Sequence, residues 1–247
     1  MPPAAEPSTT DHEGESIAGD RHARVLRRLL WPAAALAVAG LLAVYGAGCD
    51  RSEVPPVPAV AGTNLLPTLR TGATDGDFSR DYSTRTNDGG PTAEVFRLTG
   101  RGYAVTPDDY GPDFTVTYEY RFPEADTVPE ADRPKHNTGC LLFITGEDKV
   151  WPRCLEVQGR WDDTAQIKSN ARDVQVTATL DEAARDAARK PPGEWNKVKV
   201  VSRGGALTVT LNGVEVSTSE PTDLTRGRIG FQAEGFPVEF RGVAIGE

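Results

Sequence analysis

Strict alternation of apolar and polar residues along short segments constrains this chain more than any other feature. In residues 114–122 (FTVTYEYRF) every second residue is aromatic or Val, and the residues between them are Thr, Glu or Arg. Residues 197–201 and 206–217 alternate in the same way, and the second segment contains Asn212-Gly213, a pair that favours a tight hairpin turn. Because successive side chains of a strand point to opposite faces, each segment is expected to be a strand with one buried face. Frequent short strands and turns predict an all-β sandwich or jelly roll of antiparallel sheets.

The composition agrees with a turn-rich β protein. The 247 residues include 25 Gly and 19 Pro, more than a helical domain of this size normally carries. Residues 181–190 are the exception, since they show a short, polar helical pattern that ends at Pro191-Pro192. We expect a helix that decorates a loop and lies outside the core. The formal net charge of −9 argues against a nucleic-acid partner, because nucleic-acid binders normally present a basic face.

The first 49 residues have the pattern of an export signal or a membrane anchor. Residues 1–20 are small and polar, and we expect them to be disordered. Residues 21–28 contain four arginines, and residues 29–48 are uncharged. This order is typical of a secretory signal, and the uncharged run is also long enough to span a bilayer as a helix. The uncharged run ends at Cys49 in a sequence that resembles a bacterial lipobox.

Two interpretations of this N-terminal region stay open. In one, Cys49 is lipidated after cleavage; in the other, residues 21–49 remain as an uncleaved membrane helix. Both attach the protein to the membrane, through a lipid or through an N-terminal helix, and both predict a location in the cell envelope, facing the periplasm or the exterior. Residues 50–72 carry four prolines and are expected to form an extended spacer. A single folded domain is predicted over residues 73–247.

Cysteine and histidine usage limits the chemistry that the domain can carry. Besides Cys49 the chain has Cys140 and Cys154, with no Cys-x-x-Cys pair, so a structural zinc site is not expected. Cys140 and Cys154 flank a predicted turn, and a disulfide and two buried free thiols are both open interpretations. His136 is the one histidine of the predicted domain, which argues against a Ser-His-Asp or Cys-His apparatus.

Polar residues alternate with apolar residues along two of the predicted strands. Glu156 and Gln158 alternate with apolar residues in the segment 153–159, and Gln232 and Glu234 do the same in the segment near the C-terminus. Arg241 lies on the corresponding side of the last strand. Alternation therefore places these side chains on the face opposite the core. A solvated outer face and a ligand-binding face both account for the pattern.

Five short motifs in order resemble the 3-keto-disaccharide hydrolase family. They are Asn137-Thr138-Gly139 followed by an apolar strand, then the segments 148–158 (DKVWPRCLEVQ), 193–196 (GEWN), 211–213 (LNG) and 227–245 (GRIGFQAEGFPVEFRGVAI). The resemblance spans residues 94–245. It implies a concanavalin A-like jelly roll, a β-sandwich of two antiparallel sheets, in agreement with the alternation above.

The resemblance also implies an activity, the cleavage of a glycoside whose sugar carries a ketone at C3. Such cleavage by elimination needs a base near C2, a group that stabilises the enolate and a proton for the leaving oxygen. Glu156 and Glu234 are the expected base and acid, and Arg241 is the expected enolate partner. The remaining candidates bind the sugar, either through its hydroxyl groups or by ring stacking: Asn137, Gln158, Gln232 and Trp151. We expect these side chains to converge on one concave sheet face.

The alternative is a non-catalytic module that binds carbohydrate or mediates adhesion on the same jelly roll, since fold alone does not determine function. Departures from the family pattern at Phe143, Trp161 and Gly242 favour this alternative. In both cases the expected partner is an oligosaccharide or glycoside. No cofactor is predicted; a divalent metal stays an open alternative without an assigned ligand set.

Overall fold

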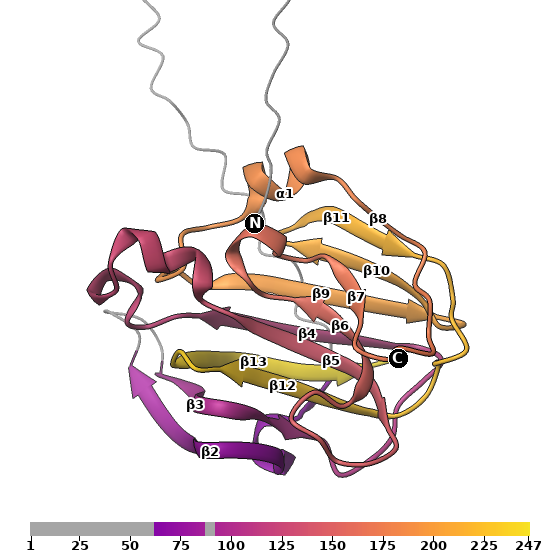
Figure 1. Ribbon diagram of the computed structural model, residues 1–247, viewed down its shortest axis with the longest axis horizontal. Coiled ribbons are helices and arrows are strands. Elements are labelled where there is room, and N and C mark those ends of the chain that lie inside the picture. The colour runs from indigo at the N-terminus through magenta and orange to yellow at the C-terminus, as the bar shows by residue number, and fades with distance from the viewer. Residues whose placement is uncertain (1–61, 87–91) are drawn as a thin grey trace, which may run out of the picture. The chain divides into compact units, whose positions relative to one another are not determined.

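The computed structural model describes residues 62–86 and 92–247 (Figure 1). Within these residues, strands dominate, and a single α-helix, α1 (Glu182–Ala188), is present. Short 3-10 helices occur at η1 (Leu66–Thr68), η2 (Ala125–Thr127), η3 (Glu130–Lys135) and η4 (Trp161–Asp163). The strands of the described region are β1 (Thr63–Asn64), β2 (Arg70–Thr86), β3 (Thr92–Val105), β4 (Phe114–Arg121), β5 (Thr138–Thr145), β6 (Arg153–Gln158), β7 (Ile167–Ser169), β8 (Ala178–Leu180), β9 (Asn196–Arg203), β10 (Ala206–Leu211), β11 (Val214–Ser219), β12 (Arg228–Glu234) and β13 (Val238–Gly246).

The strands form two antiparallel layers joined through β3. Hydrogen-bonded neighbours follow the order β7-β6-β5-β12-β3-β13-β4-β9-β10-β11-β8. The C-terminal part of β3, residues 101–105, pairs with β12, and its N-terminal part, residues 95–98, pairs with β13. In Figure 1 the layer that contains β5, β6 and β7 lies in front of β4 and β9. The predicted all-β sandwich is confirmed.

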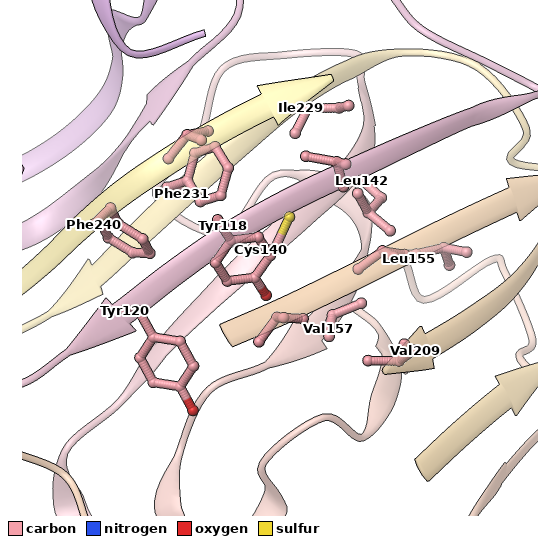
Figure 2. Close-up of a cluster of buried hydrophobic side chains, with 14 of the residues drawn as sticks. Tyr118, Tyr120, Cys140, Leu142, Leu155, Val157, Val209, Ile229, Phe231 and Phe240 are labelled. Carbon is pink, nitrogen blue, oxygen red and sulfur yellow. The ribbon is translucent and has the colours of Figure 1, made fainter. Parts of the chain in front are cut away.

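The core lies between these layers and is built from the alternating apolar residues. Tyr118 of β4 packs against Phe231 of β12, with ring centroids 5.3 Å apart, and Phe114 packs edge-on against Phe143 of β5 at 5.7 Å. Figure 2 shows how side chains from both layers meet. The residues labelled there are Tyr118, Tyr120, Cys140, Leu142, Leu155, Val157, Val209, Ile229, Phe231 and Phe240, and all of them are buried. Removal of this apolar surface from water is the main stabilising contribution to the fold.

The local predictions for the hairpin and the helix are confirmed. Asn212 and Gly213 have φ angles of 48° and 92° and connect β10 to β11 in a tight turn. This positive φ region is the one that Asn and Gly tolerate best. Helix α1 begins after Asp181, whose carboxylate accepts a hydrogen bond from the Ala184 amide as an N-terminal cap.

The packed domain begins earlier in the chain than alternation indicated. Leu65, Leu66 and Leu69 are buried, and Thr63 pairs with Ile245 of β13, so residues 62–72 are part of the sandwich although they fall in the predicted spacer. The other N-terminal predictions concern disorder, the signal or anchor, and lipidation at Cys49, and all lie outside the described residues. In the described segments no helix has the length and apolar character needed to cross a membrane.

The two cysteines of the domain are buried free thiols. Cys140 belongs to the core between the layers, whereas Cys154 packs with Leu141 and Ile144 on the opposite side of the β5–β6 pair. The disulfide interpretation is therefore wrong. The reason is strand alternation, because Cys140 is the register partner of Val157 in the core, whereas Cys154 has the opposite parity from Leu155 and Val157 on β6 and so points to the other face.

Candidate active site

Strand β5 brings the two Gln/Glu pairs of the sequence together. It pairs with β6 on one side and with β12 on the other, and Gly139 is the register partner of both Gln158 and Gln232. Leu155, Val157 and Phe231 fill the core. The polar side chains between them therefore lie on the outer face of the same layer.

Glu156 forms the floor of this face. Its side chain lies over Gly139, where a Cβ atom would be 2.8 Å from Glu156 Cδ, and only 4 % of the residue is exposed. Asn170 Nδ2 donates a hydrogen bond of 3.0 Å to Glu156 Oε2. Glycine at position 139 thus provides the space that the carboxyl group occupies.

Burial raises the pKa of Glu156 to about 7. Desolvation is the largest cause, because removal from water disfavours the charged form. The Asn170 hydrogen bond lowers the pKa, the nearby Glu234 carboxylate raises it, and the cations of Lys168 and Arg160 lower it. A carboxyl group with a pKa near neutrality can donate or accept a proton at physiological pH.

Glu234 lies at the end of β12 and is held by two N–H donors. Asn137 Nδ2 donates to Glu234 Oε2 at 2.7 Å, and Trp151 Nε1 donates to Oε1 at 3.4 Å. Asn137 precedes β5 and lies beside Glu234, and its role at the edge of a binding site stays a prediction. The two carboxyl groups are thus fixed by different partners, Asn170 for one and Asn137 with Trp151 for the other.

The face is partly covered, although alternation predicts an open one. The chain between β5 and β6 folds back over it, and Val150 O accepts a hydrogen bond of 3.3 Å from Gln232 Nε2. Gln232 is fully buried as a result, whereas Trp151 is 50 % exposed at the margin. Alternation describes the faces of a strand and contains no information about loops that pack on them.

Three buried oxygen atoms on this face have no hydrogen-bond donor in the described part of the protein: Asn137 Oδ1, Glu156 Oε1 and Gln232 Oε1. The amide orientations follow from the network, since Asn137 and Gln232 must direct their NH₂ groups toward an acceptor. A buried acceptor without a donor costs free energy, about 1–3 kcal/mol each. A ligand rich in hydroxyl groups would supply the missing donors.

A pocket of about 330 Å³ opens between the β5–β6 connection and residues 170–173, and neither of the two glutamates of the site is among the residues that line it. Trp151 and Asn170 both line it, and each of them hydrogen-bonds one of the two glutamates. An ion pair between Arg153 and Asp173 at 2.8 Å closes another part of the rim. The pocket volume falls in the range of roughly 300–1,000 Å³ that is usual for small-molecule sites.

Two predicted site residues have other roles. Arg241 lies on β13 in the other layer, where Nε and Nη2 donate to Glu119 Oε2 at 2.8 and 2.6 Å and the guanidinium stacks on Trp195. Its expected contact with the enolate is therefore not supported by its position. Gln158 is beside Glu156 in sequence, but its Oε1 accepts from the amides of Gly159 and Arg160 and so holds the chain after β6.

Sequence reasoning missed Asn170 and the specific role of Gly139. Asn170 follows the three-residue strand β7, which has no recognisable alternation, so no signal in the sequence identifies it. Gly139 appears in the Asn-Thr-Gly motif but the reason for glycine there is a contact with another strand. His136 packs between Phe122 and Phe236 at ring distances of 4.8 and 4.5 Å. Among the described residues, no group of three or more His, Cys, Asp or Glu side chains gathers in a metal-binding arrangement.

Several solved structures resemble this chain at low sequence identity. Solved structures similar to this chain include two candidate glycosyl hydrolases from Parabacteroides distasonis. The first has 19 % identity and a TM-score of 0.47, covering 73 % of this chain and 88 % of its own; the second has 20 % identity and a TM-score of 0.44, covering 68 % and 93 %. A carbohydrate-binding module from Bacillus subtilis has 10 % identity and a TM-score of 0.41, covering 69 % and 95 %. No curated protein matches the sequence.

The family relationship rests on the sequence itself. A family model described as the 3-keto-alpha-glucoside-1,2-lyase-like domain matches residues 71–246, which include every strand from β3 to β13 and both glutamates of the site. A family of this type has a carbohydrate-related function. This chain therefore belongs to the 3-keto-alpha-glucoside-1,2-lyase-like domain family.

Proposed function

We propose that this protein cleaves 3-keto-glycosides by elimination followed by hydration. The observation that carries the proposal is the pairing of Glu156 and Glu234 on one face, next to three buried acceptors that lack donors. Sugar hydroxyl groups that entered this face would satisfy the two amide oxygens, whereas Glu156 Oε1 would carry the acid proton, since Oε2 accepts from Asn170. Trp151, half exposed at the margin, offers a flat apolar surface for a pyranose ring.

The proposed reaction has two steps, an elimination and a hydration. A base removes the proton from C2, which the C3 ketone makes acidic, and the electron pair of that bond forms the enolate. The enolate then expels the oxygen at C1, which takes a proton from an acid, and a C1=C2 double bond forms. In the second step water adds its oxygen to C1 and a proton returns to C2.

The surroundings of the two glutamates favour a division of these roles. Glu156 is buried and has a pKa of about 7, so it can hold a proton at neutral pH and deliver it to the leaving oxygen. Glu234 lies less deeply and accepts from Asn137 and Trp151, and we assign it the removal of the C2 proton. Asn170 positions Glu156 in this scheme.

Turnover of a panel of 3-keto-glycosides by the purified protein tests the proposal. We expect release of 3-keto-glucose from at least one 3-keto-disaccharide, and no cleavage of the corresponding disaccharide with an unoxidised C3, because its C2 proton is not acidic. Binding of every member of the panel without turnover would contradict catalysis. That result would support the alternative, a non-catalytic carbohydrate-binding or adhesion module.

We further propose that the protein acts in the cell envelope, attached through Cys49. The support is the order of arginines, uncharged run and cysteine in residues 21–49. Metabolic labelling with a tagged fatty acid is expected to mark the wild-type protein and to leave Cys49→Ala unmarked. Equal labelling of both proteins, or of neither, would contradict lipidation at this position.

A further inference from the structure

A second pocket lies on the outer face of the other layer. Its volume is about 510 Å³, larger than that of the pocket beside Trp151. Strands β4, β9 and β10 contribute Thr117, Lys197, Lys199 and Thr210 to its wall, on the opposite parity from core residues such as Val116 and Val198. The core therefore separates this pocket from the two glutamates. The polar residues that line it include Asn64, Thr117, Glu119, Lys197, Lys199 and Arg241.

Two lysines dominate the charge of this second pocket. Lys197 and Lys199 are alternate residues of β9, so their side chains leave the same face about 7 Å apart. In the region that the structure describes, neither ammonium group has an ion-pair partner. The chain as a whole carries a net charge of −9, so this concentration of positive charge is local.

The two acidic residues of the pocket are engaged by other donors. Glu119 is the register partner of Lys197, but its Oε2 accepts two hydrogen bonds from Arg241. The planar guanidinium of arginine competes well for a carboxylate because it presents several donors in a fixed geometry. Glu94 Oε2 accepts from Asn64 Nδ2 at 2.8 Å. The lysine pair is thus left available for an external anion.

The neighbours of the lysines suit a sugar better than a simple ion. Thr117 on β4 and Thr210 on β10 are the register partners of Lys199 and flank it with hydroxyl groups. Val243 and Ala244 add an apolar wall to the same pocket. Hydroxyl groups and apolar surface beside a charged pair match a sugar ring that carries an acidic substituent.

We propose that this pocket is a second, non-catalytic binding site for acidic saccharides. The carboxylate of a uronic acid unit would lie between Lys197 and Lys199, and its ring hydroxyls would meet Thr117 and Thr210. Such a site would hold an anionic polysaccharide on the face opposite the two glutamates. The inference does not rest on the catalytic proposal, because the two sites share no residue.

Isothermal titration of the full-length protein with a trimer of galacturonic acid tests the site. The variant is Lys197→Gln/Lys199→Gln, which removes both charges but keeps most of the aliphatic stems. Binding is expected to weaken by at least ~10-fold, since a hydrogen bond to a charged group contributes about 1.5–3 kcal/mol. Affinity for the wild type should also fall as the NaCl concentration rises, because salt screens exposed charges.

Three controls make the outcome decisive. Lys135→Gln removes an exposed lysine that pairs with Asp132 on η3 and should leave binding unchanged. Glu156→Gln should also leave it unchanged, which separates this site from the catalytic one. A neutral glucose trimer should bind at least ~10-fold more weakly than the acidic trimer if one charge-assisted contact is lost. Absence of binding, equal binding by the double lysine variant, or equal affinity for inorganic sulfate alone would overturn the proposal.

Discussion

Replacing either glutamate of the site by glutamine is expected to lower turnover of a 3-keto-disaccharide by at least ~100-fold. Glutamine keeps the size of the side chain and can still accept the hydrogen bond from Asn170 at position 156 or from Asn137 at position 234. It can neither donate a proton as an acid nor take one as a base. Steady-state measurement of kcat/KM for Glu156→Gln and Glu234→Gln gives the result, with the exposed Glu215→Gln on β11 as a matched control.

The pH dependence distinguishes the role of Glu156 from that of a merely structural residue. If Glu156 acts as the acid it must be protonated, so kcat/KM of the wild type should fall as the pH rises through about 7. This decline should be absent from the residual activity of Glu156→Gln. Unchanged activity in both glutamine variants would leave a binding module as the better interpretation.

Stability measurements show whether lost activity reflects lost folding. The pKa of Glu156 is about 7 in the folded protein and near 4.5 in the unfolded chain, so the folded state binds this proton more tightly. The contribution of this protonation to the free energy of unfolding is complete below pH about 4.5, and it is lost as the pH rises through about 7. Glutamine does not ionise, so Glu156→Gln should be at least as stable as the wild type above pH 7 in thermal unfolding. A lower melting temperature there would contradict this account of burial.

Gly139→Ala is expected to lower kcat/KM by about 100-fold while the domain stays folded. The new Cβ would overlap the carboxyl group of Glu156, and the three nearest atoms all belong to that side chain. The end of the Glu156 side chain can move aside at modest cost, but it would then leave its position beside Asn170. A displacement of about 1 Å in a catalytic group is enough for a loss of this size. Circular dichroism tests whether the variant is folded, and steady-state kinetics on the same preparation measure kcat/KM.

A double-mutant comparison identifies the route of this effect. If Gly139 acts only by making room for Glu156, then Gly139→Ala adds little to the loss already present in Glu156→Gln. Gly193→Ala serves as the matched control, because a Cβ there has its nearest neighbours at 3.9 Å and should change nothing. Additive losses in the double variant, or unfolding of Gly139→Ala alone, would show that the glycine serves the fold instead.

The fold could be predicted from the sequence because alternation is a local property. The apolar residues of 114–122 specify a buried side for that strand wherever the strand is placed, and Asn212-Gly213 specifies the turn between β10 and β11. The same argument correctly placed the side chain of Glu156 on the opposite face of its strand from Leu155 and Val157. Order of motifs along the chain was sufficient to identify the family.

The composition of the site could not be predicted, because each strand of a sandwich has an outer side and there are two layers. Arg241 and Glu234 both lie opposite core residues, yet β12 pairs with β5 while β13 pairs with β4, so their side chains reach different outer faces. The pairing partner of a strand depends on contacts between residues far apart in sequence. Burial is equally nonlocal: the chain around Val150 covers Gln232, and burial raises the pKa of Glu156. Alternation along the sequence therefore determined which side of each strand is polar, whereas strand order and loop packing alone decided which polar residues meet and how they ionise.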